Sequence, residues 1–266
     1  MKKVFVCGNS FSHGHYLIKD NISGPINYDT VKVGQNKPYI SFIKDELDID
    51  YVLLAKPIAS NYCICKQIEY AIEYKPDLVI VNFSTARHID FTVEGNRLSC
   101  LPTLKNFVYD EKTFAPGMKN PTGSDDIDQA IKSLRYTILK EYASTTNPEY
   151  ILINQFIYGF TDYYLKIDQE RLMILGAINL LRKHNIKFIV VDLIETEKQP
   201  DLSNPVALAD TNVLNGLKIE PLVKIPAGFR EKYPNPTDDF HFNEKGQQEI
   251  AKLLMPLVKE LLSFNQ

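Results

Sequence analysis

The sequence of 266 residues predicts an α/β fold, a three-layer α/β/α sandwich around a parallel sheet, in a single domain. Four short apolar runs rich in β-branched residues have the length and composition of strands buried on both faces. Amphipathic helical stretches lie between them, and alternating strands and helices are typical of a parallel sheet covered by helices. The length is sufficient for one sizeable core and requires no second domain.

The predicted strands are largely apolar instead of strictly alternating, as expected where helices cover both faces. They span residues 3–7, 51–55, 77–83 and 187–193. The predicted helices carry apolar residues three and four positions apart, which gives each one buried side. They span residues 38–47, 62–74, 165–184 and 244–262, and we expect Pro256 to kink or weaken the last.

Two stretches interrupt this rhythm. Residues 97–124 are rich in Pro, Gly, Asn and Lys, and residues 195–236 carry six of the fifteen prolines. Both are interpreted as long excursions from the core, and such loops usually border a functional site. We expect a capped helix over residues 125–142, whereas residues 150–164 fit either a strand or a helix.

Composition argues against several classes of partner. The net charge of −3 and a pI near 6.0 provide no basic field for nucleic acid or anionic membrane. Residues 4–7 are too short for the apolar core of a signal peptide, and no run approaches the roughly 20 apolar residues of a membrane-spanning helix. We therefore expect a soluble, cytoplasmic protein with neither nucleic-acid nor membrane partners.

Neither the cysteines nor the histidines predict a metal site. The chain has four cysteines, and the spacing of Cys63 and Cys65 fits neither a redox motif nor a zinc site. His13 and His15 lie close together without a third ligand nearby in the sequence. We expect reduced thiols and neither a metal nor another cofactor.

The first predicted strand leads directly into Gly8, Asn9 and Ser10. Glycine permits a tight turn after a buried strand, and the serine that follows lies at the strand's carboxyl end, near the start of a helix. Small α/β hydrolases place a nucleophile at such a position. The alternative is that these polar residues only cap a helix, which is common after a first strand.

A second motif precedes the last predicted helix. Asp238 and Asp239 are followed by His241 and Asn243, in a predicted loop. A carboxylate three residues before a histidine can hold one imidazole nitrogen while the other faces a serine hydroxyl. The alternative is a capping loop in which Asn243 caps the helix and His241 is a surface residue.

Together the two motifs resemble those of the SGNH/GDSL serine hydrolases, a family with a Gly-Asp-Ser block at its start and an Asp-x-x-His block before its terminal helix. Gly8-Asn9-Ser10 is similar to the first block, with Asn in place of Asp, and residues 238–243 are similar to the last. The resemblance implies a flavodoxin-like parallel sheet. It also implies Ser10 as nucleophile, His241 as general base and Asp238 as the acid that orients it, with Asp239 as the second candidate.

The family's middle blocks, which supply oxyanion donors, differ here. The loop after the second strand, residues 55–61, contains no glycine. After the third strand the chain reads Asn82 to His88, and no asparagine occupies the place of the family's donor asparagine. Some members of the family, including ones from phage genomes, are similar at these points, which suggests a phage-encoded protein. The candidate oxyanion or substrate-binding residues are Ile58, Ala59, Asn61, Ser84, Thr85 and Arg87.

The resemblance implies hydrolysis of an ester or acetyl group, on a small molecule or a glycan, through an acyl-enzyme. Because the two middle blocks differ, a catalytically weak or silent domain that binds glycan or protein is an alternative. An O-acyltransferase would use the same residues and differ only in its acceptor. The sequence predicts neither the substrate nor the oligomeric state.

Overall fold

The computed structural model describes residues 1–14, 37–55, 59–86, 89–93, 96–100, 163–194, 212–235 and 238–263; within these ranges the side chains of residues 89–100, 163 and 238–240 are not described. A parallel five-stranded sheet forms the centre, in the order β2-β1-β3-β6-β7. Its strands are β1 (Lys2–Cys7), β2 (Ile49–Leu53), β3 (Leu78–Asn82), β6 (Phe188–Asp192) and β7 (Leu222–Lys224). Counted within the sheet alone, this is the flavodoxin-like order 2-1-3-4-5.

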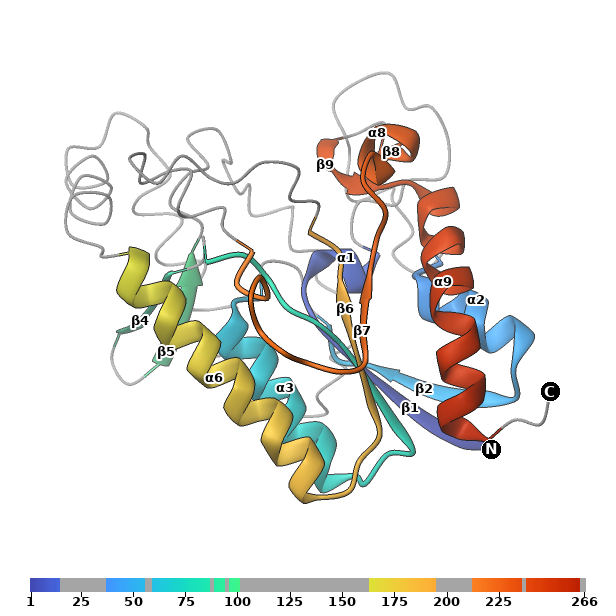
Figure 1. Ribbon diagram of the computed structural model, residues 1–266, viewed down its shortest axis with the longest axis horizontal. Helices are drawn as coiled ribbons and strands as arrows, with labels where there is room; N and C mark the ends of the chain where they lie inside the picture. Colours follow the sequence, from blue (N-terminus) through green and yellow to red (C-terminus); the bar gives the residue numbers. More distant parts are fainter. Residues whose placement is uncertain are drawn as a thin grey trace.

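Helices cover both faces of this sheet (Figure 1). One face packs against α3 (Asn61–Glu73) and α6 (Tyr163–Lys183), and the other against α2 (Tyr39–Glu46) and α9 (Glu244–Leu262). The α/β/α sandwich predicted from the sequence is therefore confirmed. The first four strands and these four helices lie where the sequence predicted them, within about two residues at each end.

Two hydrophobic cores result from this layering, because successive side chains of each strand point to opposite faces of the sheet. In β1, Phe5 and Cys7 join the core under α3 and α6, whereas Val4 and Val6 join the core under α2 and α9. Within α9, Ile250, Leu254, Val258 and Leu262 make the buried stripe at helical spacing. The helix continues through Pro256.

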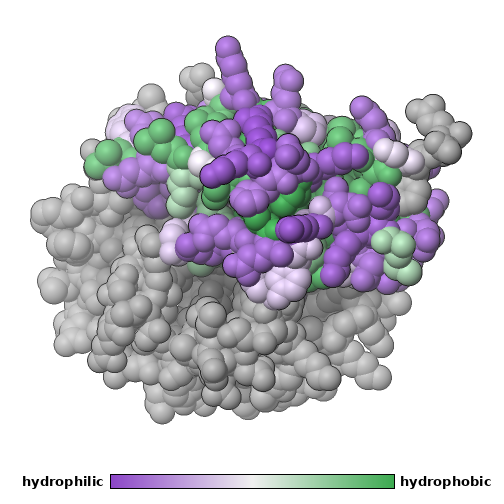
Figure 2. All heavy atoms as spheres, turned by 90° about the horizontal axis from the view of Figure 1, so that it is seen from below, coloured by the Kyte–Doolittle hydropathy of each residue, from purple (hydrophilic) through white to green (hydrophobic). Residues whose placement is uncertain are grey.

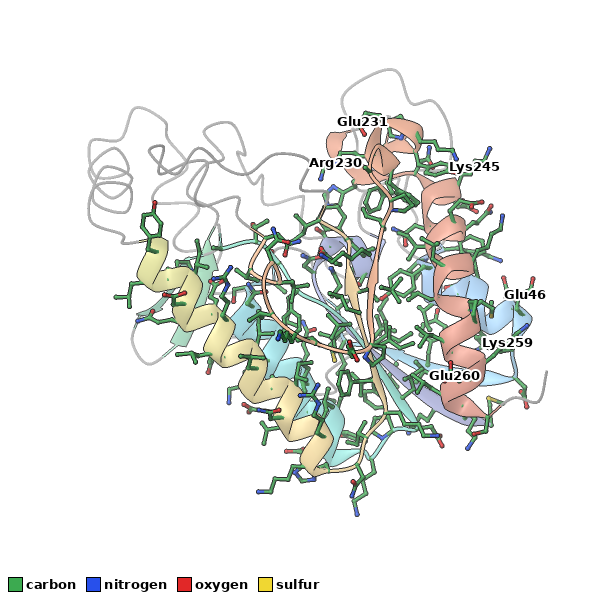
Figure 3. The ribbon with its side chains drawn as sticks, in the orientation of Figure 1. Glu46, Arg230, Glu231, Lys245, Lys259 and Glu260 are labelled. Carbon is green, nitrogen blue, oxygen red and sulfur yellow. The ribbon has the colours of Figure 1, made fainter. Side chains whose placement is uncertain are left out.

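The outer faces of α2 and α9 carry exposed charged side chains. Figure 3 labels Glu46 of α2 together with Lys245, Lys259 and Glu260 of α9, and these four charged side chains are exposed. The face in Figure 2 is likewise mainly hydrophilic over the described residues, with scattered hydrophobic side chains. Among the described helices, none is long and apolar enough to cross a membrane.

The structure corrects part of the interpretation of residues 195–236 as a long excursion from the core. Their described part contains β7, the edge strand of the central sheet, then α8 (Phe229–Lys232) and β8 (Pro234–Asn235). The start of the other predicted excursion, residues 97–124, belongs to the antiparallel hairpin of β4 (Ile89–Val93) and β5 (Asn96–Cys100). The predicted helix over 125–142 lies outside the described residues, as does nearly all of residues 150–164.

A second correction concerns the segment before α9. Instead of a loop, Asp238–Phe242 forms strand β9, which pairs with β8 in a small antiparallel sheet. Asn243 then caps α9, its side chain accepting a hydrogen bond from the Gly246 N–H at 2.9 Å. Asn243 therefore caps the helix, as in the alternative interpretation of this motif, and His241 lies two residues before it in β9.

Candidate active site

The turn after β1 brings Ser10 to the carboxyl edge of the sheet. Ser10 is the first residue of a short helix, α1 (Ser10–His13), and Asn9 caps it by accepting a hydrogen bond from the Phe11 N–H at 3.0 Å. Gly8 is required by close packing: a Cβ there would lie 2.9 Å from the Ser12 Oγ and 3.2 Å from the Asn82 carbonyl oxygen. The cap that the sequence suggested is thus present, and the serine lies at the carboxyl end of β1 as expected.

His241 reaches this serine from the other end of the chain. Its Nε2 lies 2.8 Å from the Ser10 Oγ, within hydrogen-bonding distance. Both side chains are partly buried. For the serine hydroxyl to donate in this hydrogen bond, His241 must carry its own proton on Nδ1.

Aromatic packing fixes the plane of the imidazole. The ring of Phe11 lies with its centroid 4.9 Å from that of His241, at an interplanar angle of 36°. Phe11 also packs against Phe242, with 5.5 Å between the centroids. Because Phe11 directly follows Ser10, the residue next to the serine supports the histidine that faces it.

The two candidate acids lie on the same strand as the histidine. Asp238 and Asp239 belong to β9, as does His241, and the Asp238 backbone pairs with that of Asn235. Their side chains lie outside the described part of the structure. The acid's role remains a prediction.

The candidate oxyanion residues follow neighbouring strands of the sheet. Ala59 and Asn61 come after β2, and Ser84 and Thr85 come after β3; these strands flank β1, whose end carries Ser10. The carboxyl ends of parallel strands meet at one edge, where open α/β sheets bind ligands. Ile58 and Arg87 fall outside the described residues.

Asn61 is fully engaged in a buried network. Its Nδ2 donates to the Ser84 carbonyl at 3.0 Å and to Glu170 Oε2 at 2.7 Å, and its Oδ1 accepts from the Ser84 N–H at 2.6 Å. Both amide hydrogens of Asn61 and the Ser84 N–H are thereby used inside the protein. This network holds the segment after β3 against the start of α3 and against α6.

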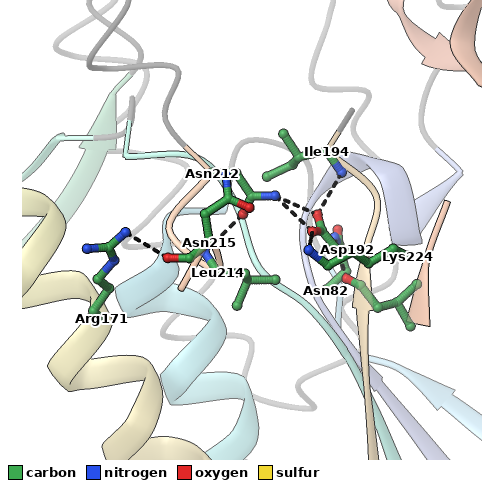
Figure 4. A network of polar contacts seen from close by, with 9 residues as sticks. Asn82, Arg171, Asp192, Ile194, Asn212, Leu214, Asn215 and Lys224 are labelled. Atoms are coloured by element: carbon green, nitrogen blue, oxygen red, sulfur yellow. Dashed lines mark hydrogen bonds and ion pairs between the residues drawn. The ribbon is translucent and has the colours of Figure 1, made fainter. Parts of the chain in front are cut away.

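A second buried network borders the same edge (Figure 4). Asp192, which ends β6, accepts hydrogen bonds from Asn212 Nδ2 at 2.9 Å to both carboxylate oxygens and from the Ile194 N–H at 3.2 Å. Burial raises the pKa of this carboxyl, against the opposing effects of the Asn212 and Ile194 hydrogen bonds and the Lys224 charge. The Asn212 backbone in turn bridges to Thr85, so the network reaches the segment after β3.

Three further polar residues were not identified from the sequence. Gln67, Gln247 and Asp192 are each less than a tenth exposed. The sequence pattern does mark each of them as unusual. The two glutamines interrupt the apolar faces of α3 and α9, and the aspartate ends an apolar strand. Buried polar side chains need hydrogen-bond partners, so a polar residue at a core position indicates a specific contact.

The two buried cysteines Cys7 and Cys65 are poor candidates for a nucleophile. Burial raises the pKa of the Cys7 thiol strongly, and it raises that of Cys65 to about 12. Both thiols therefore remain protonated near neutral pH, and the thiolate is the reactive form. Cys7, Cys63 and Cys65 are free thiols.

Metal ligands do not gather in the described part of the chain: no three side chains of His, Cys, Asp or Glu come together there. His13 is described and belongs to α1, whereas His15 lies outside the described residues.

Neither family models nor curated proteins match this chain. Solved structures with a similar course of the chain include the psychrotrophic esterase EstA from Pseudoalteromonas sp., at 10% identity and a TM-score of 0.47, covering 99% of this chain and 100% of that one. The lipase Lip_vut3 from a goat rumen metagenome has 12% identity and a TM-score of 0.47, with 96% and 97% covered. A carbohydrate acetylesterase family member from Sinorhizobium meliloti has 9% identity and a TM-score of 0.45, with 99% and 100% covered.

Proposed function

We propose that this protein is a serine hydrolase that cleaves an ester or acetyl group through an acyl-enzyme. The observation that carries the proposal is the 2.8 Å contact between Ser10 Oγ and His241 Nε2 at the carboxyl edge of a parallel sheet. A nucleophile within hydrogen-bonding distance of a base is the arrangement that activates a serine hydroxyl.

In the first half of the reaction, His241 Nε2 accepts the hydroxyl proton as Ser10 Oγ attacks the carbonyl carbon of the ester. The resulting tetrahedral oxyanion collapses when the protonated His241 gives its proton to the leaving alkoxide. The alcohol departs, and the acyl group stays on Ser10 as an ester.

In the second half, His241 takes a proton from a water molecule, and the hydroxide formed attacks the acyl carbon. Collapse of the second tetrahedral intermediate returns the proton to Ser10 Oγ and releases the carboxylic acid. We assign Asp238 the role of accepting the Nδ1–H of His241, which fixes the tautomer and stabilises the imidazolium. Asp239 is the second candidate for this role.

The oxyanion requires hydrogen-bond donors aimed at it. We propose the backbone N–H of Ile58 or Ala59 as one donor, with Thr85 or Arg87 as a second donor or as an anion-binding group. Asn61 and Ser84 receive a different role, because their amide hydrogens already bond within the protein. They hold the segment after β3 in place.

The proposal is tested by measuring the hydrolysis of p-nitrophenyl acetate by purified wild type, Ser10→Ala and Ser41→Ala. Ser41 is the matched control, since it lies on α2, its hydroxyl is 2.9 Å from that of Tyr51 on β2, and it takes no part in the site. We expect wild type and Ser41→Ala to turn over the ester and Ser10→Ala to fall to the background rate. An inactive wild type, or undiminished activity in Ser10→Ala, would reject the proposal.

The acyl acceptor and the natural substrate are separate questions. We propose an acetylated carbohydrate or another small ester as the substrate, and a sugar hydroxyl in place of water would make the same residues an O-acyltransferase. An array of acetylated glycans, read by mass spectrometry for loss or gain of acetyl groups, separates these outcomes.

A catalytically silent glycan-binding domain is the second candidate, and one observation favours it. Two of the six candidate donor residues, Asn61 and Ser84, have their amide hydrogens committed elsewhere, and losing an oxyanion donor typically costs about 10²–10³ in rate. Tight binding on the same array without any change in acetylation would support this candidate.

A further inference from the structure

We propose that two buried glutamines, Gln67 and Gln247, are positioning residues that clamp the turn carrying Ser10 from opposite faces of the sheet. Gln67 lies on α3 and Gln247 on α9, which belong to the two opposite helical layers. The two residues are 8% and 2% exposed, respectively. This inference rests on the proposed function, because it concerns the serine of that site.

Gln67 binds both backbone groups of Gly8, two residues before the serine. Its Oε1 accepts the Gly8 N–H at 2.7 Å, and its Nε2 donates to the Gly8 carbonyl at 3.2 Å. The last sheet pairing of β1 with β3 is that of Cys7 with Val81. The carboxamide therefore supplies the hydrogen bonds that a neighbouring strand would have made, at the point where the chain leaves the sheet.

Gln247 binds the residue directly after the serine. Its Nε2 donates to the Phe11 carbonyl at 3.1 Å, and its Oε1 accepts the Tyr39 N–H at 3.0 Å. The Phe11 ring also packs on His241. Because α9 begins three residues after His241, Gln247 connects the helix that follows the base to the turn that carries the nucleophile.

The serine's own helix cannot hold this geometry alone. Helix α1 has four residues, and helices this short are unstable without external contacts. Bonds at Gly8 and Phe11 fix the backbone on both sides of Ser10. A displacement of about 1 Å from the productive geometry can cost about 10² in rate, so the two side chains act on catalysis through Ser10.

The test uses Gln67→Met, Gln247→Met and the double variant, since methionine keeps much of the side-chain volume and removes the hydrogen bonds. Gln248→Met is the matched control, because Gln248 lies next to Gln247 on α9 and is only partly buried. Four quantities are measured below the unfolding temperature of every variant. They are kcat and KM for p-nitrophenyl acetate, the rate of fluorophosphonate labelling, and hydrogen–deuterium exchange of peptides covering residues 5–14.

We expect each single variant to lower kcat and the labelling rate about 10- to 100-fold with little change in KM, as for an interaction that counts in the transition state. Exchange within residues 5–14 should become faster in both variants and stay unchanged in Gln248→Met. Two results would overturn the clamp. One is a labelling rate equal to that of the wild type in folded Gln67→Met and Gln247→Met. The other is a labelling rate in Gln248→Met that falls as much as theirs.

Failure of the proposed function has a different signature. If the wild type neither labels nor turns over ester, the hydrolase proposal is rejected, while the exchange measurement still decides on the clamp. Faster exchange limited to the turn in Gln67→Met and Gln247→Met then supports the clamp, and unchanged exchange overturns it.

Discussion

The Oγ of Ser10 and the Nε2 of His241 lie 2.8 Å apart although 231 positions separate the two residues in the chain. Strand β1 delivers the serine to the carboxyl edge of the sheet, and β9 delivers the histidine from the segment before the terminal helix. Phe11, the residue after the serine, packs its ring against that of the histidine. The two ends of the sequence thus meet at one point of the fold.

Replacing the base should remove nearly all activity. In His241→Gln the side chain no longer accepts the Ser10 proton and returns it to the leaving group, so we expect kcat for p-nitrophenyl acetate to fall about 10³-fold or more. Thermal unfolding of the variant serves as the control for folding. Activity within a few-fold of wild type in folded His241→Gln would exclude a catalytic role for this residue.

Asp238→Asn and Asp239→Asn decide which acid orients the histidine. Without the orienting carboxylate, the imidazolium that forms during the reaction is not stabilised and the imidazole can adopt the wrong tautomer. This loss typically costs about 10²–10⁴ in kcat. We expect a loss of this size for Asp238→Asn and a small effect for Asp239→Asn. The reverse ranking would transfer the role to Asp239, and no loss in either variant would contradict an acid on β9.

Gly8→Ala should damage both stability and activity. The added methyl group would lie 2.9 Å from the Ser12 Oγ, 3.0 Å from the Ser12 Cβ and 3.2 Å from the Asn82 carbonyl oxygen, so the turn has to shift. Overpacking of this kind costs about 1–3 kcal/mol in free energy of unfolding. Denaturant unfolding measures it, with Gly176→Ala as control, because a Cβ at Gly176 meets no atom within 4 Å. An equal effect in both variants would contradict the close packing at Gly8.

Asp192→Asn should change how stability depends on pH. Burial raises the pKa of Asp192 in the folded state, so the native protein holds this proton where the unfolded chain, with an aspartate pKa of about 3.9, has lost it. The contribution of Asp192 to stability therefore falls as pH rises through that window and is constant above the raised value.

The measurement is the free energy of unfolding of both proteins across this range. Relative to wild type, Asp192→Asn should gain stability as the pH rises from about 3.9 and reach a plateau above the raised pKa. A difference that does not change with pH would show that the Asp192 carboxyl titrates alike in the folded and unfolded chains.

The layers of the fold were predictable because their signals are strong over many residues. The buried stripe of α9 is one example, with apolar side chains at helical spacing from Ile250 to Leu262. Strand β7 was missed because it has three residues and lies between Pro221 and Pro226, which resembles a loop. Proline is tolerated beside an edge strand, which is the position that β7 occupies.

Parts of the site were predictable and parts were not. The motifs around Ser10 and His241 were visible in the sequence, but their contact depends on the tertiary fold. Strand β9 was missed because acidic residues such as Asp238 and Asp239 are uncommon in strands and its partner β8 has two residues. The hydrogen bonds of Asn61 to Ser84 and Glu170 join segments up to 109 positions apart, so no local sequence pattern predicts them.

Mapping the site of fluorophosphonate attachment shows whether Ser10 is the nucleophile and whether His241 activates it. Wild type is treated with the reagent, digested and examined by tandem mass spectrometry, with Ser10→Ala and His241→Gln treated in parallel. We expect one adduct on Ser10 of the wild type, none in Ser10→Ala and a strongly slowed reaction in His241→Gln. An unmodified Ser10 in the wild type, or labelling at an equal rate without His241, would contradict it.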